Sequence, residues 1–367
     1  MTMHLDSPKI DVIYPDDCAE RWDGYVDAHP KGSIFHKSAM CRVYSETRKH
    51  ETCAVAARNA DGNIVALLPA VRVETISGLA SMIASRAILY AEPLCDDTAE
   101  GRYALAQLLD AHDKAVRRRT LFTEVRAMLP PGAERDVLEQ NGYEFFDYLN
   151  YVVDLDRDRD QLWNSIGKQT RAKIRRSHRR GMTIEHDTSV AGVHRIYPLL
   201  RASYARSRVP LAGIDLFLSA LRFVSAGEIQ IRIATHKGRD VAGTVGLYYR
   251  DRYFAWYGGT TRPQGIDPFA AIVWDEIEWA HQHGLRFYDF GGAGWPDEDY
   301  GPRTFKSRFH GALVCFGRYR KVYSRHRLAL AEKGYESLRA LFSQFPRETA
   351  TDGADNDRSP VSERKPK

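Results

Sequence analysis

A pattern of hairpin, helix and strand occurs twice along the 367-residue chain. Residues 51–73 and 230–249 alternate apolar and polar side chains around a short polar turn, which predicts two antiparallel hairpins. After one further strand, each hairpin is followed by an amphipathic helix and a short strand, predicted over 103–117 and 121–125 and again over 270–283 and 286–290. We therefore expect an α/β (α+β) protein of two similar halves, each a mixed, mostly antiparallel sheet flanked by helices.

Changes in composition predict the limits of these halves. From about Pro346 the chain is rich in charged residues, Pro and Ser, which predicts a disordered tail over 346–367. The boundary between the halves is expected near Asn150, which gives one domain over 1–150 and a second over 151–345. The apolar stretches are strand-sized and shorter than the roughly 20 residues that span a bilayer. With acidic residues where a signal peptide needs basic ones, the chain is expected to be cytoplasmic.

The five cysteines are scattered, with no C-x-x-C pair and no histidine at metal-ligand spacing. They are expected to be reduced thiols, and the sequence predicts no metal site. The net charge of +5 is small for this length, so the position of the charge is more informative than its sum.

A basic helix is predicted over residues 166–181, IGKQTRAKIRRSHRRG, which contain seven lysines and arginines. Arg171, Arg175 and Arg179 recur at i, i+4 and i+8, where like charges repel unless anions offset them. Three interpretations stay open: a solvated surface helix, a site for a phosphate-bearing substrate, and a nucleic-acid-binding surface.

Residues 286–311 combine a glycine turn, aromatic residues and one lysine. A strand ending near Asp289 runs into Gly291 to Gly294, and a loop with Trp295 and Tyr300 follows. Lys306 lies between Phe305 and Phe309, whose packing can hold its ammonium in place. A fixed ammonium there could stabilise the oxyanion formed when an amine attacks an ester or thioester. Asp289 and Tyr300 are the candidate acceptors of the amine proton, although Asp289 is equally explained as a cap of the following turn.

Residues 262–267, RPQGID, come close to the R/Q-x-x-G-x-G/A loop by which GNAT acetyltransferases bind the coenzyme A pyrophosphate at a helix N-terminus. The last position departs from that pattern, because Asp267 stands where a small residue belongs and a carboxylate repels pyrophosphate. Whether this loop binds coenzyme A stays open.

Four features in this order give residues 151–324 a resemblance to the FemAB-like branch of the GNAT acyltransferase superfamily. They are a strand ending in Asp154-Leu155 with Leu162-Trp163 after it, the basic helix, the helix-to-strand passage over 274–289, and FKSRF at 305–309. Members of that branch attach amino acids from aminoacyl-tRNA to peptidoglycan precursors and consist of two GNAT-like domains. The resemblance therefore implies a two-domain fold and acyl transfer.

The resemblance also implies roles for single residues. Lys306 stands at the family's F-K-x-x-F lysine, near the acyl carbonyl and a terminal phosphate. Arg206 matches an arginine implicated in holding the diphosphate of the precursor. Around His36 the chain is similar to the family's first substrate loop, but the basic residue expected one or two helical turns later has no clear counterpart. The predicted substrate-binding residues are Arg206, Arg171, Arg175, Trp295, Arg308 and His36.

The chain is thus expected to be an acyltransferase that transfers an aminoacyl or acyl group to an amine of a cell-envelope precursor. No tightly bound cofactor is expected, since the donor, aminoacyl-tRNA or else acyl-coenzyme A or acyl carrier protein, is a co-substrate. The expected partner is a phosphate-bearing precursor, and contact with tRNA, acyl carrier protein or a membrane surface stays open. The alternatives are an N-acyltransferase of exopolysaccharide or lipid biosynthesis and a nucleic-acid-binding protein.

Overall fold

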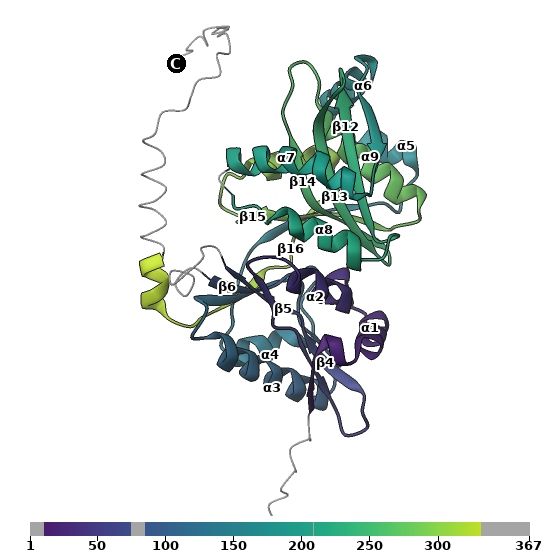
Figure 1. The fold of residues 1–367 in the computed structure, drawn as a ribbon. Coiled ribbons are helices and arrows are strands. Elements are labelled where there is room, and N and C mark those ends of the chain that lie inside the picture. Colours follow the sequence, from purple (N-terminus) through teal and green to yellow (C-terminus); the bar gives the residue numbers. More distant parts are fainter. Residues whose placement is uncertain (1–10, 75–84, 208, 332–367) are drawn as a thin grey trace, which may run out of the picture.

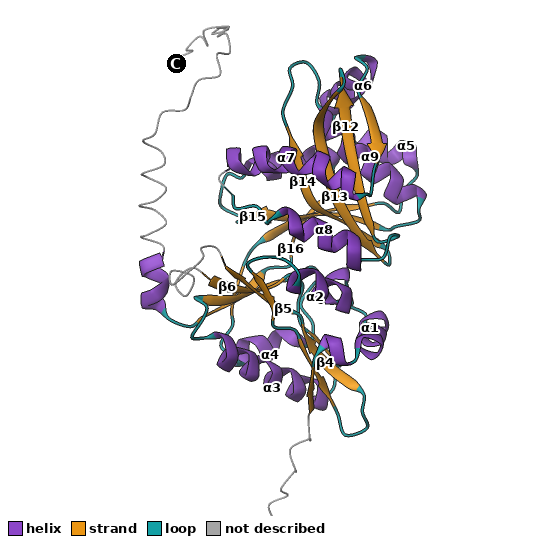
Figure 2. Ribbon diagram, viewed as in Figure 1, coloured by secondary structure: helices purple, strands orange, loops and turns teal. Residues whose placement is uncertain are grey.

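The computed structural model describes residues 11–74, 85–207 and 209–331, which form two lobes (Figure 1). The tail predicted over 346–367 lies outside these residues. Each lobe contains strands covered by helices, as the sequence pattern predicts (Figure 2).

The first lobe carries two sheets, with strand orders β1-β3-β4-β7 and β2-β5-β6-β8-β17-β9. Helix α3 begins where Thr98 accepts a hydrogen bond from the Gly101 amide, and it buries an apolar stripe that includes Leu105 and Leu109. The elements of this lobe are β1 (Asp11–Ile13), α1 (Ala19–Ala28), α2 (Ser38–Ser45), β2 (His50–Thr52), β3 (Val55–Arg58), β4 (Ile64–Leu68), β5 (Ala70–Glu74), β6 (Ser85–Leu89), β7 (Leu94–Cys95), α3 (Ala99–Val116), β8 (Phe122–Arg126), α4 (Glu134–Gln140) and β9 (Glu144–Phe146).

The second lobe is built on one sheet of order β11-β12-β13-β14-β15-β10-β16. Helix α7 packs against β13 and β14, and α9 packs against the same sheet together with α6. The elements of the second lobe are β10 (Leu149–Asp154), α5 (Arg159–Ser165), α6 (Lys168–Arg179), β11 (Thr183–His186), α7 (Val190–Ser207), α8 (Ile214–Phe223), β12 (Ile229–His236), β13 (Arg239–Tyr249), β14 (Arg252–Thr260), α9 (Pro268–Gln282), β15 (Phe287–Gly294), α10 (Gly301–Lys306) and β16 (Ala312–Cys315). The strand that follows them, β17 (Arg318–Val322), belongs to the first-lobe sheet.

The predicted duplication is present in both lobes. The hairpins are β3–β4 and β12–β13, and both are antiparallel. Helix α3 leads to β8, which pairs in parallel with β6 over 87–89, and α9 leads to β15, which pairs in parallel with β14 over 252–254. A helical crossover therefore adds one parallel strand to an otherwise antiparallel meander in each half.

The last strand corrects the predicted domain limits. Residues 151–345 were expected to form one unit, but β17 returns to the first lobe and inserts between β8 and β9. The preceding strand β16 remains in the second lobe, where it pairs with β10. The first lobe is therefore completed by Arg318–Val322, because β8 and β9 both need a hydrogen-bonding neighbour that residues 1–150 do not supply.

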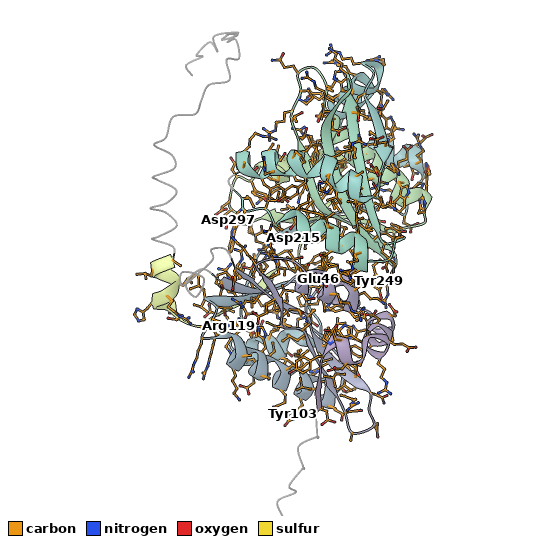
Figure 3. All side chains as sticks on the ribbon, viewed as in Figure 1. Glu46, Tyr103, Arg119, Asp215, Tyr249 and Asp297 are labelled. Atoms are coloured by element: carbon orange, nitrogen blue, oxygen red, sulfur yellow. The ribbon has the colours of Figure 1, made fainter. Side chains whose placement is uncertain are left out.

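The lobes also share buried side chains. One apolar cluster joins Phe35 and Met40 of the first lobe to Phe217 and Val245 of the second. The backbone amide of Arg48 donates to Asp215 at 2.5 Å, and Tyr249 donates to Asp27 across the junction. Figure 3 places Asp215 and Tyr249 along this junction.

Candidate functional site

The site is organised by the divergence of two parallel strands. β14 and β15 pair only from Arg252 with Phe287 to Phe254 with Asp289, and beyond this point the strands separate. β15 then bulges against β10, with register shifts near Asn150, and Gly291 takes a φ of 68° that favours glycine. Backbone groups of Phe290 to Gly292 are consequently available to side chains instead of a neighbouring strand.

A cavity of about 780 Å³, which we call the α9 cavity, lies beside the N-terminus of α9 and the end of β14. Gly258 and Gly259 line it, and a side chain at Gly259 would collide with the Leu199 carbonyl of α7, 2.5 Å from the Cβ position. Four cations from three segments surround the cavity: Lys173, Arg176, Arg262 and Arg308. Size and charge suit a phosphate-bearing substrate.

Asp267 occupies the helix terminus at which a coenzyme A pyrophosphate would be expected. It is the N-cap of α9 and accepts from the Ala270 amide at 3.2 Å. Its other carboxylate oxygen lies 3.8 Å from Arg308. The first turn of α9 therefore has a carboxylate in place, and the cavity's attraction for phosphate comes from its side-chain cations.

The basic helix is present as α6, but a different face of it reaches the cavity. Lys173 and Arg176 line the α9 cavity, whereas Arg175 packs 5.3 Å from the Trp163 ring centroid on another side. Arg171 donates to Asn164 at 2.6 Å. Lys173 and Arg176 are therefore the α6 residues that line this cavity, and substrate contacts of Arg171 and Arg175 stay a prediction.

Lys306 lies between the α9 cavity and the bulge of β15. Its ammonium donates to the carbonyls of Phe290 at 2.7 Å, Gly291 at 3.4 Å and Gly292 at 2.6 Å. Burial lowers the pKa of Lys306 to about 8, against the opposing effect of Asp289. All three N–H bonds point at the segment where β14 and β15 diverge, and Phe305 and Phe309 pack beside them, with ring centroids 5.5 Å apart.

The contacts of Asp289 and Tyr300 are those of structural side chains and not those of an exposed catalytic base. Asp289 is fully buried, accepts from the Gly291 amide at 2.7 Å and pairs with Arg252 at 3.2 Å. Burial raises the pKa of Asp289 despite these partners. Tyr300 packs against Gly294 at the start of α10, and burial raises its pKa as well. Neither residue lines the α9 cavity.

A second cavity of about 440 Å³, the inter-lobe cleft, is lined by residues of both lobes. Phe35, Arg86 and Arg126 come from the first lobe, and Trp256 and Gly292 from the second. Adjacent residues of β14 divide between the two cavities: positions 256–257 line the cleft and 258–260 line the α9 cavity. The two cavities are therefore lined by neighbouring residues of β14, and Gly291 and Gly292 of the bulge line the inter-lobe cleft.

The remaining predicted residues differ in position. Arg308 lines the α9 cavity. Arg206 donates to Ser203 at 2.9 Å and to the Thr260 carbonyl, so it lies beside two residues that line the α9 cavity. Trp295 stacks on Phe146 of the first lobe, with centroids 4.9 Å apart.

His36 does not contact a substrate, and that prediction is wrong. The side chain is 0% exposed. Its Nε2 lies 2.7 Å from the Glu92 carbonyl, and its Nδ1 lies 2.8 Å from the Ser33 hydroxyl. Burial lowers the pKa of His36 to about 4. Nδ1 accepts from the Ser33 amide in the cap of the short helix Ile34–His36, and Nε2 is held by the Glu92 carbonyl, so neither nitrogen is left for a ligand.

Sequence reasoning did not select the cleft arginines. Arg86, Arg126 and Arg318 come from three strands that are far apart in the chain. Arg318 lies beside Arg126 only because β17 returns to the first lobe. The one local signal is an arginine inside an apolar strand, as in SRAIL at 85–89.

Comparison with known proteins supports the expected resemblance. Residues 165–307 match the model of an acetyltransferase (GNAT) domain. The structure of FemX superposes with a TM-score of 0.64 at 14% identity, covering 90% of this chain and 99% of that one. The C-terminal domain of a putative lysylphosphatidylglycerol synthetase from Agrobacterium fabrum gives 0.55 at 15% identity, with 89% and 98% coverage. A tandem GNAT protein from the clavulanic acid pathway gives 0.53 at 11% identity, with 86% and 99% coverage.

These matches confirm the tandem GNAT-like fold predicted from the sequence, and this fold is shared with FemX, as the resemblance to the FemAB-like branch implies. No curated protein matches the chain by sequence. Within the described residues, no helix has the length and apolar character needed to cross a membrane.

Proposed function

We propose that this acyltransferase, whose second lobe carries a GNAT domain, transfers an aminoacyl group to an amine of a cell-envelope precursor. The observation that carries the proposal is that neighbouring residues of β14 line two different cavities. The α9 cavity is basic and suits a phosphate-bearing donor, whereas the inter-lobe cleft is lined by both lobes and suits the acceptor. In this proposal the donor carbonyl and the attacking amine meet at the β15 bulge, which lines the cleft and which Lys306 contacts.

Two features favour aminoacyl-tRNA over acyl-coenzyme A as the donor. Asp267 caps α9 and opposes a pyrophosphate at its first turn. Arg175 and Arg179 of α6 extend the positive charge beyond the α9 cavity, along a second hollow, which suits a polyanion better than a small molecule. Nucleic-acid binding, considered above as a separate function, then becomes part of donor recognition.

The acceptor class rests on the resemblance to the FemAB-like branch. FemX and a putative lysylphosphatidylglycerol synthetase domain share the fold over most of their length, and the name of the second refers to a lipid product. We infer an amine on a peptidoglycan precursor as the acceptor, in the cytoplasm where charged tRNA is made. Acyl transfer from coenzyme A or acyl carrier protein to a saccharide or lipid amine is the second candidate, supported by the GNAT domain and the R-P-Q-G part of the loop over 262–267.

The reaction needs little covalent help from the protein. The donor ester is already activated, so holding the amine about 3 to 3.5 Å from the carbonyl supplies roughly 7 to 11 kcal/mol of the barrier. Lys306 would exchange its longest contact, with the Gly291 carbonyl at 3.4 Å, for the oxyanion. Asp289 and Tyr300 are the proposed acceptors of the amine proton, which would reach them through water. Arg206, Arg308 and Trp295 are proposed to position the substrates.

One experiment separates the donors. The protein is incubated with nucleotide-linked muropeptide and with either charged tRNA or acyl-coenzyme A, and the muropeptide is then weighed by mass spectrometry. A mass increase of one amino-acid residue with charged tRNA supports the proposal. If the mass increases by an acyl group, and only with acyl-coenzyme A, the second candidate replaces the proposal. If the mass increases with neither donor, the muropeptide is not the acceptor.

A further inference from the structure

One face of the first-lobe sheet forms a wall of the inter-lobe cleft. Pairing places Ile88 beside Glu124 and Arg126 beside Arg318. Because side chains two residues apart share a face of a strand, Arg86 of β6 and Arg320 of β17 point to the same side. Arg86, Arg126 and Arg318 all line the cleft.

On this face of the first-lobe sheet, arginines outnumber the carboxylates that pair with them among the described residues. Glu124 is buried and accepts from Arg126 at 3.0 Å, Arg318 at 3.0 Å and Arg320 at 2.6 Å. Burial alone would raise the pKa of Glu124, but the three guanidinium groups lower it to about 2. Three arginines thus share one carboxylate, which leaves an excess of positive charge.

Arg86 forms no ion pair within the described part of the chain, although Glu124 acts on its charge from a greater distance. The Nε of Arg86 is buried and has no hydrogen-bond partner there. Glu74, which lines the cleft, is paired with Arg72 at 2.7 Å. The segment 75–84, which precedes β6 and has the sequence TISGLASMIA, contains no acidic residue.

A buried guanidinium N–H without a hydrogen-bond partner is costly, and repulsion among the arginines adds to that cost. Burial and Arg126 lower the pKa of Arg86, and the same two causes lower the pKa of Arg318 to about 10. Crowded guanidinium groups whose charge is disfavoured in this way are expected of an anion site.

Flat ring surfaces lie next to these arginines. The guanidinium of Arg126 is 5.5 Å from the Tyr90 ring centroid, and Arg318 stacks 3.4 Å from the Tyr148 centroid. Six aromatic side chains line the cleft: Phe35, Tyr90, Tyr204, Phe254, Trp256 and Tyr257. Such a wall suits the apolar face of a sugar or another flat ring.

We propose that the inter-lobe cleft binds a ring-containing acceptor through a phosphate or carboxylate group held by Arg86, Arg126 and Arg318. The identification of this ligand as the acceptor rests on the proposed function. Arg206 is not part of this anion site, because its guanidinium donates to Thr260 and Ser203. Arg318 also lies against Gly292, with Nη2 3.4 Å from the position of a Cβ there, so a ligand on this arginine reaches the bulge that Lys306 holds.

Binding to three sugars that share one ring tests the site. Calorimetric titration with N-acetylglucosamine 6-phosphate, N-acetylmuramic acid and neutral N-acetylglucosamine compares a phosphate, a carboxylate and no anion. We expect at least one anionic sugar to bind about 10-fold or more tightly than the neutral one, and its identity tells phosphate from carboxylate. Arg86→Gln should weaken that binding about 10- to 100-fold, the loss of one charged hydrogen bond.

Arg222→Gln is the matched control, since it removes an arginine that is 69% exposed on α8. Equal affinity for all three sugars, no binding at millimolar concentration, or an equal loss in Arg222→Gln would overturn the proposal. The melting temperature gives an independent readout. Without ligand, Arg86→Gln should not lower the melting temperature, because it relieves repulsion among the arginines. Arg126→Gln should lower it, because Arg126 also pairs with Glu124.

Failure of the anion site and failure of the proposed function give different results. Anion-selective binding without any acyl transfer leaves the site intact and removes the function. Transfer to an amine acceptor with kinetics that Arg86→Gln does not change removes the site and leaves the function.

Discussion

At the scale of single residues, we expect the loss of the Lys306 side chain to lower both the stability of the fold and the turnover number. Its ammonium satisfies three carbonyls of the β15 bulge, so Lys306→Ala leaves these groups without a donor. We expect the free energy of unfolding to fall by about 1 to 3 kcal/mol. If the ammonium also meets the oxyanion, kcat should fall on the order of 10²-fold, with little change in acceptor affinity. Urea unfolding and steady-state kinetics at a temperature where the variant is folded measure both effects.

The pH dependence of Lys306 separates an electrostatic role from a basic one. Its pKa in the folded protein, about 8, lies below the usual 10.5. A charged amine is therefore disfavoured by folding, and between pH 8 and 10.5 stability should rise with pH. Turnover should instead fall through about pH 8 as the ammonium is lost. Lys306→Arg stays charged and should lack this fall. A kcat that keeps rising through this range would assign Lys306 the role of a base.

At the scale of elements, the two faces of α6 provide a matched pair of variants. Lys173 and Arg176 line the α9 cavity, whereas Arg175 and Arg179 line a separate hollow with Trp163. Each double alanine variant removes two positive charges from the same helix. For a small donor such as coenzyme A, only Lys173→Ala with Arg176→Ala should weaken binding, by about 10- to 100-fold. For charged tRNA both variants should weaken binding and reduce its salt dependence.

Fluorescence titration at two salt concentrations measures this difference. Unchanged affinity for both donors in the Lys173 and Arg176 variant would return α6 to the role of a solvated helix.

Local patterns in the sequence accounted for most elements and for part of the site. Alternation marked the hairpins β3–β4 and β12–β13, and amphipathic periodicity marked α3 and α9. The F-K-x-x-F segment drew attention to Lys306, which contacts the β15 bulge and whose catalytic role stays a prediction. The charge spacing selected Arg171 and Arg175 but not the cavity residues Lys173 and Arg176, because spacing defines a stripe on a helix but not which stripe faces a cavity.

At the scale of the whole molecule, pairing between distant segments escaped prediction. The return of β17 to the first lobe follows from contacts among β8, β9 and β17, which no local pattern contains. The same return places Arg318 beside Arg126, so the difference from the expected domain limit and the failure to select these arginines from the sequence have one cause. His36 was misassigned for a related reason, since its partner Glu92 lies 56 residues away.

The returning strand and the shared apolar cluster predict that the two lobes unfold together. Tyr319 of β17 is 1% exposed and packs 5.2 Å from the Phe145 centroid in the first-lobe core. Tyr319→Ala should therefore cost about 3 to 5 kcal/mol. If unfolding is cooperative, hydrogen exchange should show the slowest amides of β4 and β13 losing the same free energy of opening.

Tyr319→Phe is the matched control for this experiment. The Tyr319 hydroxyl is buried without a hydrogen-bond partner among the described residues, so its removal should leave stability unchanged or raise it. A loss of protection confined to β4, with β13 unchanged in Tyr319→Ala, would show that the lobes open separately. The inter-lobe cleft would then be formed by units that can part without unfolding, and its width would vary with domain motion. Equal losses mean that a substrate bound across both lobes stabilises the whole chain, because both walls of its site belong to one cooperative unit.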